Sequence, residues 1–197
     1  DDARPTSYGS RSEVRKSLVN FLRANIPGFE IPGYDRALVF DGWTALCEQS
    51  ANPVFFEKSP QHPHHWGTLE LLLEWMRTTD YQVKVIGLVR NPMSVMYSAL
   101  QLFHTDPQSR QFGWAHACRN ILKFGEMLDD DQFYFVRYED VVSQPESEFR
   151  KLCNFIGVGY ESAVGQSVHS SSLNKWRDDV TYRLQLAKDV ASLAKEL

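Results

Sequence analysis

The chain has 197 residues, of which 43% are hydrophobic, 13% aromatic and 23% charged, and this composition excludes a disordered tail and predicts a single domain over residues 1–197. The formal net charge of −4 provides no basic field for a nucleic-acid backbone or an anionic membrane surface, so neither partner is expected. The three cysteines are odd in number and far apart, and no apolar run is long enough to span a membrane. The sequence therefore favours neither a disulfide framework, a zinc site nor a membrane-spanning segment.

The first part of the chain carries helix signals. Ser10 and Glu13 have the spacing of a capping box, and apolar residues follow at helical intervals until Pro27-Gly28, which predicts a first helix. Residues 36–50 suit a strand at their start and a helix further on. We favour a helix for this segment.

A strand, helix and strand are predicted next. The apolar run 54–56 is followed by Glu57-Lys58-Ser59-Pro60 and predicts a short buried strand with Lys58 at its carboxyl end. Residues 66–78 carry leucines on one helical face, and residues 83–89 form a second run rich in β-branched residues. The order of these segments is that of a parallel β-α-β unit.

The second half of the chain continues this alternation. Arg90-Asn91-Pro92 ends the second strand, and the sequence beyond it predicts helices over 93–102, 112–128 and 145–156 and a third strand over 133–136. Residues 160–178 are polar and rich in serine, which indicates a loop. Residues 181–197 repeat apolar residues at the spacing of a terminal amphipathic helix.

Together these elements predict an α/β fold in which helices flank a parallel sheet on both faces, forming three layers. Ligands of such sheets bind beyond the carboxyl ends of the strands. Lys58, Arg90 and Arg137-Tyr138 each follow a predicted strand. We therefore expect a ligand site at this edge of the sheet.

Arg90 and Ser98 are the sharpest chemical signal in the sequence. Arg90 closes a predicted buried strand and Ser98 lies on the helix that follows, so both can converge on one anion near the N-terminal half of that helix. A guanidinium fork with a hydroxyl suits a phosphate monoester. Taken alone, the spacing is also explained by an arginine that caps the helix.

Three further motifs give this pair its context. Lys58 at a strand end can neutralise charge on a group in transfer. The other two are the strand end Val136-Arg137-Tyr138-Glu139-Asp140 and the late run Ser170-Ser171-Ser172-Leu173-Asn174-Lys175-Trp176. In this order, over roughly residues 54–178, the four motifs resemble the superfamily of sulfotransferases that use 3′-phosphoadenosine-5′-phosphosulfate (PAPS), particularly its tyrosylprotein, carbohydrate and bacterial branches.

The resemblance implies a P-loop-NTPase-like sulfotransferase fold and a role for individual residues. It implies that Arg90 and Ser98 hold the 3′-phosphate of the nucleotide and that Lys58 faces the sulfuryl group. The remaining nucleotide contacts implied by the resemblance are Tyr138, Ser170, Ser171, Lys175 and Trp176.

The sequence departs from the family pattern in two places. Some relatives carry another arginine twelve residues after the first, where this chain has Leu102. The family also opens with a strand, a loop of the type Gly-x-x-Arg-Ser-Gly-Thr-Thr and a helix. Gly9-Ser10-Arg11-Ser12 lacks both the preceding apolar strand and the following glycine. We therefore expect the chain to be the C-terminal portion of the domain, with the first βα unit, about fifty residues with its connection, lying upstream.

The general base is less clearly marked. Where the cytosolic branch has its catalytic histidine, this chain has Pro60, and the glutamate of the tyrosylprotein branch lies in the expected upstream segment. We select His62 as the candidate base, because a histidine can accept a hydroxyl proton near neutral pH, and His64 and His65 stay open as alternatives. No metal is expected, because acidic and thiol ligands at regular spacing are absent. Glu57 is expected to anchor its loop.

The sequence thus predicts a sulfotransferase that moves a sulfuryl group from PAPS to a hydroxyl of a small molecule, carbohydrate or tyrosine, leaving adenosine 3′,5′-bisphosphate. Two alternatives stay open: a non-catalytic nucleotide-binding or scaffold domain of the same fold, and a nucleotide-phosphate kinase of related architecture. A kinase would need a Walker-type lysine loop and a magnesium-holding acid, and neither is visible. Acceptor and oligomeric state are open, and bacterial cytoplasm is favoured over a Golgi lumen because nothing suggests disulfides.

Overall fold

The computed structural model describes residues 10–52, 54–166, 168–169 and 173–197. Its contacts divide the chain into two compact units, the first made of residues 1–59 and 77–79 and the second of residues 60–76 and 80–197. The single domain over residues 1–197 stays a prediction. Across the described ranges, no helix combines the length and the apolar character needed to cross a membrane.

The first unit contains two helices, α1 (Arg11–Asn25) and α2 (Asp35–Ser50), as predicted. α1 begins with the predicted capping box. The Glu13 N–H donates to the Ser10 hydroxyl at 3.4 Å, and the Ser10 N–H donates to the Glu13 carboxylate at 2.7 Å, so two donors of the first turn are satisfied. The buried core of the pair consists of Leu22, Ile26 and Leu38.

The predicted strand over residues 54–56 is wrong. This segment has no regular secondary structure, and its side chains are not buried: Phe56 is 72% exposed and Val54 45% exposed. A short apolar run becomes a strand only when a neighbouring strand completes its hydrogen bonds, and no described residues pair with this one. Lys58 therefore follows an irregular segment instead of a strand end.

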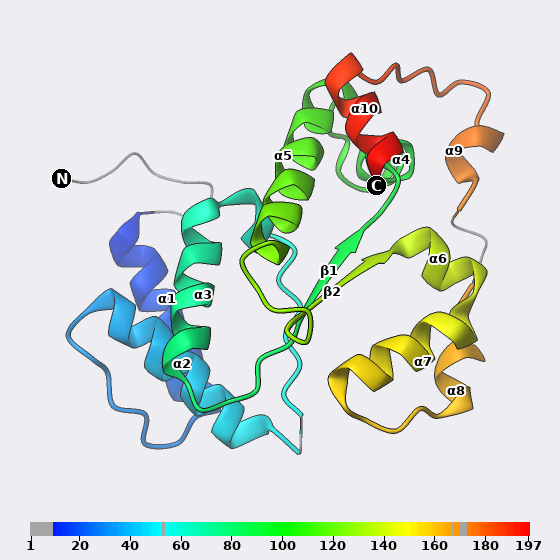
Figure 1. Ribbon diagram of the computed structural model, residues 1–197. Coiled ribbons are helices and arrows are strands. Elements are labelled where there is room, and N and C mark those ends of the chain that lie inside the picture. The colour runs from blue at the N-terminus through cyan, green and yellow to red at the C-terminus, as the bar shows by residue number, and fades with distance from the viewer. Residues whose placement is uncertain (1–9, 53, 167, 170–172) are drawn as a thin grey trace. The chain divides into compact units, whose positions relative to one another are not determined.

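The second unit contains the sheet. Strand β1 (Val85–Val89) pairs in parallel with β2 (Phe133–Arg137), in a register that runs from Val85 opposite Phe133 to Val89 opposite Arg137, and Figure 1 shows the two arrows side by side. β1 begins two residues later than predicted. The fold is α/β with a parallel sheet, but this sheet has two strands among the described residues, so the predicted three-layer arrangement is not confirmed.

Helical segments account for most of the remaining second unit. Those predicted at 66–78, 93–102 and 145–156 are present within one residue of these bounds. The segments are η1 (His62–His64), α3 (Trp66–Thr78), α4 (Pro92–Phe103), α5 (Pro107–Gly125), α6 (Tyr138–Ser143), α7 (Pro145–Ile156), α8 (Ser162–Gln166), α9 (Lys175–Asp178) and α10 (Lys188–Glu196).

Three helix predictions need correction. α5 starts five residues earlier than predicted, because the Asp106 carboxylate caps it by accepting the N–H groups of Gln108 and Ser109 at 3.2 and 3.0 Å. The predicted loop over 160–178 contains the short helices α8 and α9. The terminal helix starts only at Lys188, because the chain before it packs against the core without forming a helix.

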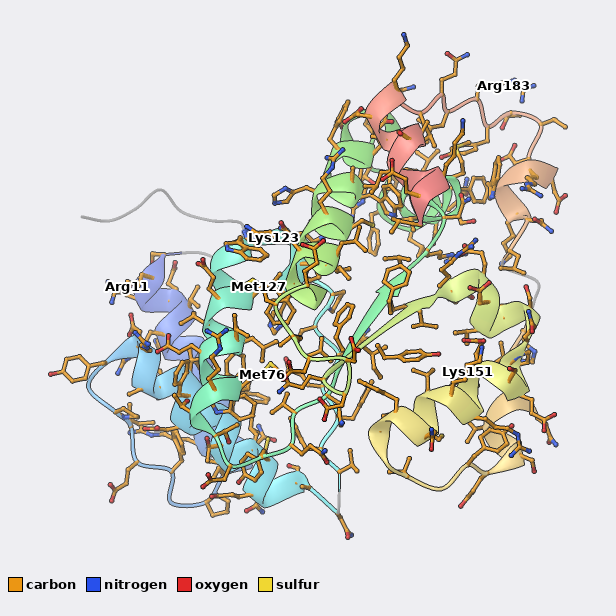
Figure 2. The ribbon with its side chains drawn as sticks, in the orientation of Figure 1. Arg11, Met76, Lys123, Met127, Lys151 and Arg183 are labelled. Carbon is orange, nitrogen blue, oxygen red and sulfur yellow. The ribbon has the colours of Figure 1, made fainter. Side chains whose placement is uncertain are left out.

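The main core of the second unit lies between β1, α4, α5 and α10. Its buried members are Val89, Met96, Trp114, Ala115, Cys118, Val190 and Leu193. Burial raises the pKa of the Cys118 thiol to about 12, so this thiol stays protonated and packs as an apolar group. On α5, the ammonium of Lys123, labelled in Figure 2, lies 3.9 Å from the centre of the Trp66 ring at the start of α3.

We predict that Gly87→Ala destabilises the protein by about 1–3 kcal/mol, since overpacking a filled core costs this much. Gly87 is buried in β1, and a Cβ atom there would lie 2.7 Å from Cζ of Phe133 and 2.8 Å from Cγ2 of Ile121. Chemical denaturation of both proteins measures the difference. Gly67→Ala is the matched control, because a Cβ at Gly67 meets no atom within 4 Å. Equal losses in the two variants would contradict the close packing of β1 against α5 and β2.

Candidate functional site

The carboxyl ends of β1 and β2 bring two of the predicted site residues together. The strands end in register at Val89 and Arg137, so the next residues, Arg90 and Tyr138, leave the sheet as neighbours. The guanidinium carbon of half-buried Arg90 lies 4.5 Å from the centre of the Tyr138 ring, within cation–π range. The contact holds the guanidinium beside the ring at the carboxyl end of the sheet.

α4 starts directly beyond Arg90. Its cap is Asn91, whose side-chain oxygen accepts the Met93 N–H at 2.9 Å, with Pro92 in the first turn. The cap is therefore asparagine and not arginine, which removes the helix-capping explanation for Arg90. A helix N-terminus at this point also favours negative charge beside Arg90.

Ser98 lies further along α4 and is half-buried. It is the sixth residue after Pro92, about 9 Å further along the helix axis. Ser94, one turn before it on the same face, is 4% exposed and donates from its hydroxyl to the Leu173 carbonyl at 3.4 Å. This bond ties the late polar segment to α4.

In this late segment, α9 begins at Lys175 and is in contact with α4. Lys175 and Trp176 therefore lie next to α4. Lys175 is exposed, and the guanidinium of Arg177 lies 5.1 Å from the centre of the half-buried Trp176 ring. The predicted contacts Ser170 and Ser171 lie outside the described residues.

Lys58 and His62 belong to different units. Lys58 is exposed in the first unit, between Glu57 and Ser59, where the Ser59 hydroxyl donates to the Glu57 carboxylate. His62 is half-buried in η1 of the second unit.

η1 packs on α5 through a buried amide. The Asn120 side-chain nitrogen, on α5, donates to the Pro63 carbonyl at 2.8 Å and lies 3.1 Å from the His116 Nε2. Burial, with smaller electrostatic contributions from the neighbouring basic groups His65, Arg110 and His116, lowers the pKa of His64 below its ordinary 6.5. The His64 imidazole is therefore neutral at neutral pH and able to accept a proton.

Two residues at this site were missed by sequence reasoning. The Trp114 indole, on α5, donates to the Arg90 carbonyl at 2.9 Å, and the Glu139 carboxylate, at the start of α6, accepts the Asn91 N–H at 2.9 Å. Both line a cavity of about 30 Å³ together with Arg90 and Arg137. Glu139 could have been found from its place directly after Tyr138 at a strand end, whereas nothing in the sequence marks Trp114.

Two curated relatives are similar to part of the chain. The chain is 26% identical over 135 residues to the omega-hydroxy-beta-dihydromenaquinone-9 sulfotransferases of Mycobacterium bovis and Mycobacterium tuberculosis. The similarity covers 59% of this chain and 34% of each relative, so the chain spans about a third of the length of the curated relatives it matches.

Solved structures support the fold. The sulfotransferase domain from the curacin biosynthetic pathway matches with a TM-score of 0.64 at 23% identity, covering 80% of this chain and 67% of that domain. The sulfotransferase domain from a Synechococcus olefin synthase matches with a TM-score of 0.66 at 25% identity, covering 80% of this chain and 63% of that domain. The model of the sulfotransferase family matches residues 17–162, more than half of the 197 residues. The chain belongs to the sulfotransferase family.

Proposed function

We propose that the protein transfers a sulfuryl group from PAPS to a hydroxyl of an acceptor and leaves adenosine 3′,5′-bisphosphate. The observation that carries this proposal is the meeting of Arg90 and Tyr138 at the carboxyl ends of two parallel strands, 4.5 Å apart, beside the N-terminus of α4. A phosphate placed there would meet a guanidinium fork and the positive end of a helix. Membership of the sulfotransferase family makes a sulfuryl donor the natural ligand.

The side chains at this edge fit a phosphorylated nucleotide. Arg90 supplies donors for the 3′-phosphate, Ser98 supplies a hydroxyl from α4, the helix that follows Arg90, and Tyr138 presents an aromatic ring against the guanidinium. Lys175 and Trp176 lie on α9, which is in contact with α4, so they can reach the same ligand. Ser170 and Ser171 complete the proposed nucleotide contacts.

The transfer itself is proposed to depend on Lys58 and His62. When bound, PAPS supplies the sulfuryl group, whose bond to the 5′-phosphate oxygen breaks as the bond to the acceptor oxygen forms. Lys58 stabilises the negative charge that develops on the bridging oxygen, and His62 takes the proton of the acceptor hydroxyl. His64 is the alternative base, because its depressed pKa keeps the imidazole neutral.

The acceptor class is a hydroxyl-bearing molecule. The mycobacterial relatives are named for a hydroxylated dihydromenaquinone, which supports an alcohol as acceptor without selecting one. Because acceptor specificity depends on loops that differ between members of one fold, small molecules, carbohydrates and tyrosine are all retained. A cytoplasmic location stays a prediction.

The nucleotide assignment predicts a preference that calorimetric titration of the full-length protein measures. Adenosine 3′,5′-bisphosphate is expected to bind at least about tenfold more tightly than adenosine 5′-monophosphate, because a charged hydrogen bond from Arg90 to the 3′-phosphate is lost with the monophosphate. Adenosine 5′-diphosphate, which has the same number of phosphates but none at the 3′ position, is the control for total charge. Equal affinities for all three nucleotides would rule out the proposed use of PAPS.

A further inference from the structure

One peptide group at the candidate site is held from both sides. The carbonyl of Arg90 and the N–H of Asn91 belong to the same peptide bond. The carbonyl accepts the indole N–H of Trp114 at 2.9 Å, and the N–H donates to the carboxylate of Glu139 at 2.9 Å. The two partners come from α5 and α6, which are separate elements of the fold.

This arrangement fixes an orientation that the strand and the helix leave undetermined. A peptide group is planar, and its carbonyl and N–H point in opposite directions when it is trans. One hydrogen bond leaves the plane free to tilt about that bond, whereas two bonds on opposite sides hold it. The Arg90–Asn91 peptide lies between the end of β1 and the start of α4. The backbone hydrogen bonds of the sheet end before this peptide, and those of the helix begin after it.

The partners are themselves well anchored. Trp114 is 9% exposed and belongs to the main core, so the position of its indole is set by packing. Glu139 directly follows Tyr138, the residue whose ring lies against the Arg90 guanidinium. The Arg90 backbone and side chain are thus both held by the first two residues of α6, and Trp114 holds the opposite side of the peptide.

A carboxylate beside a proposed phosphate site calls for a reason, because its charge opposes anion binding. The hydrogen bond that Glu139 accepts from the Asn91 N–H is such a reason, and it does not depend on the negative charge. We propose that Glu139 and Trp114 are positioning residues, which orient the Arg90–Asn91 peptide so that the guanidinium faces the 3′-phosphate. This inference rests on the proposed function, since it assumes that Arg90 reads that phosphate.

The experiment compares Glu139→Ala with Glu139→Gln in the full-length protein. Alanine removes the acceptor of the Asn91 N–H, whereas glutamine removes the charge and keeps an oxygen that can accept. We expect Glu139→Ala to lower the affinity for adenosine 3′,5′-bisphosphate about tenfold and to leave that for adenosine 5′-monophosphate nearly unchanged, while Glu139→Gln keeps most of the preference. Asp140→Ala is the matched control, because it removes a carboxylate one residue away that pairs only loosely with Arg137, at 3.9 Å.

A second measurement follows the hydrogen bond itself. Hydrogen exchange at the Asn91 amide is expected to be faster in Glu139→Ala than in Glu139→Gln or Asp140→Ala. Trp114→Phe, which keeps an aromatic ring and loses the indole donor, should reduce the same nucleotide preference from the other side of the peptide. This variant tests the inference if Glu139→Ala does not fold.

The possible results distinguish a failure of this inference from a failure of the proposed function. If the unmodified protein binds both nucleotides equally, the proposed function fails and the inference fails with it. If the unmodified protein prefers the bisphosphate and Glu139→Ala keeps that preference, the inference alone is overturned. Equal effects of alanine and glutamine would show that Glu139 acts through its charge, which also overturns the positioning role.

Discussion

Replacing Lys58 with alanine is expected to lower turnover about a hundredfold to a thousandfold, the range observed when one group that stabilises transition-state charge is removed. Affinity for adenosine 3′,5′-bisphosphate should change little, because this product lacks the sulfuryl group toward which the lysine is directed. Lys58 is exposed, and the neighbouring Glu57 is held by the Ser59 hydroxyl, so the substitution disturbs no buried packing. Steady-state kinetics with PAPS and product titration measure the two quantities.

The matched control for this experiment is Lys16→Ala. Lys16 is an exposed lysine of the same unit, on α1, outside the proposed site, and its removal should change neither turnover nor product affinity. Parallel losses of turnover and product affinity in Lys58→Ala would make Lys58 a nucleotide-holding residue. Unchanged turnover in Lys58→Ala would exclude Lys58 from the catalytic step, whereas no turnover in the unmodified protein would favour the scaffold alternative.

Arg90→Lys is expected to weaken binding of adenosine 3′,5′-bisphosphate about tenfold to a hundredfold, which corresponds to roughly 1.5–3 kcal/mol for a charged hydrogen bond. Lysine keeps the positive charge and loses the planar fork that lies against the Tyr138 ring. Because Asn91 and not Arg90 caps α4, the helix start survives the substitution and the melting temperature should change little. Titration and thermal unfolding without ligand measure both effects.

Arg150→Lys is the matched control for Arg90→Lys, because Arg150 also lies against a tyrosine ring. Arg150 lies 4.3 Å from the centre of the Tyr160 ring and pairs with Glu146 at 2.8 Å on the exposed surface of α7. Arg150→Lys therefore breaks the same kind of arginine–tyrosine contact outside the proposed site and should leave nucleotide affinity unchanged. A lower melting temperature with unchanged affinity in Arg90→Lys would give Arg90 a purely structural role.

Local signals in the sequence were sufficient to predict a helix start where residues close in sequence satisfy the hydrogen bonds of its first turn. The Ser10–Glu13 capping box and the proline that opens α4 both specify a helix start within a few residues, and both predicted helices are present. The start of α5 at Pro107 was predictable in the same way, because Asp106 is a typical helix cap, although the predicted helix began at residue 112.

Predictions failed where the outcome depends on distant residues. Residues 54–56 have the composition of a strand, but a strand needs a partner that composition does not reveal. The start of α10 depends on Gln111 of α5, a buried side chain whose oxygen accepts the Ala187 N–H at 2.7 Å. At the site, Arg90 and Tyr138 were each predicted as ligand-binding residues. The hydrogen bonds of Trp114 and Glu139 to the Arg90–Asn91 peptide join residues far apart in sequence and are visible only in the structure.

The parallel pairing of β1 with β2 has a consequence for how the protein folds. The Asn91–Glu139 bond joins residues 48 positions apart, and the chain between them includes α4 and α5. Contacts of such long range form slowly, because the entropy of closing the intervening chain is lost before they stabilise anything. We therefore expect Arg90 and Tyr138 to meet late in folding, together with the pairing of β1 and β2. A nucleotide that recognises the pair would bind the completed fold and none of its precursors, and its presence during refolding should draw the population toward the native state.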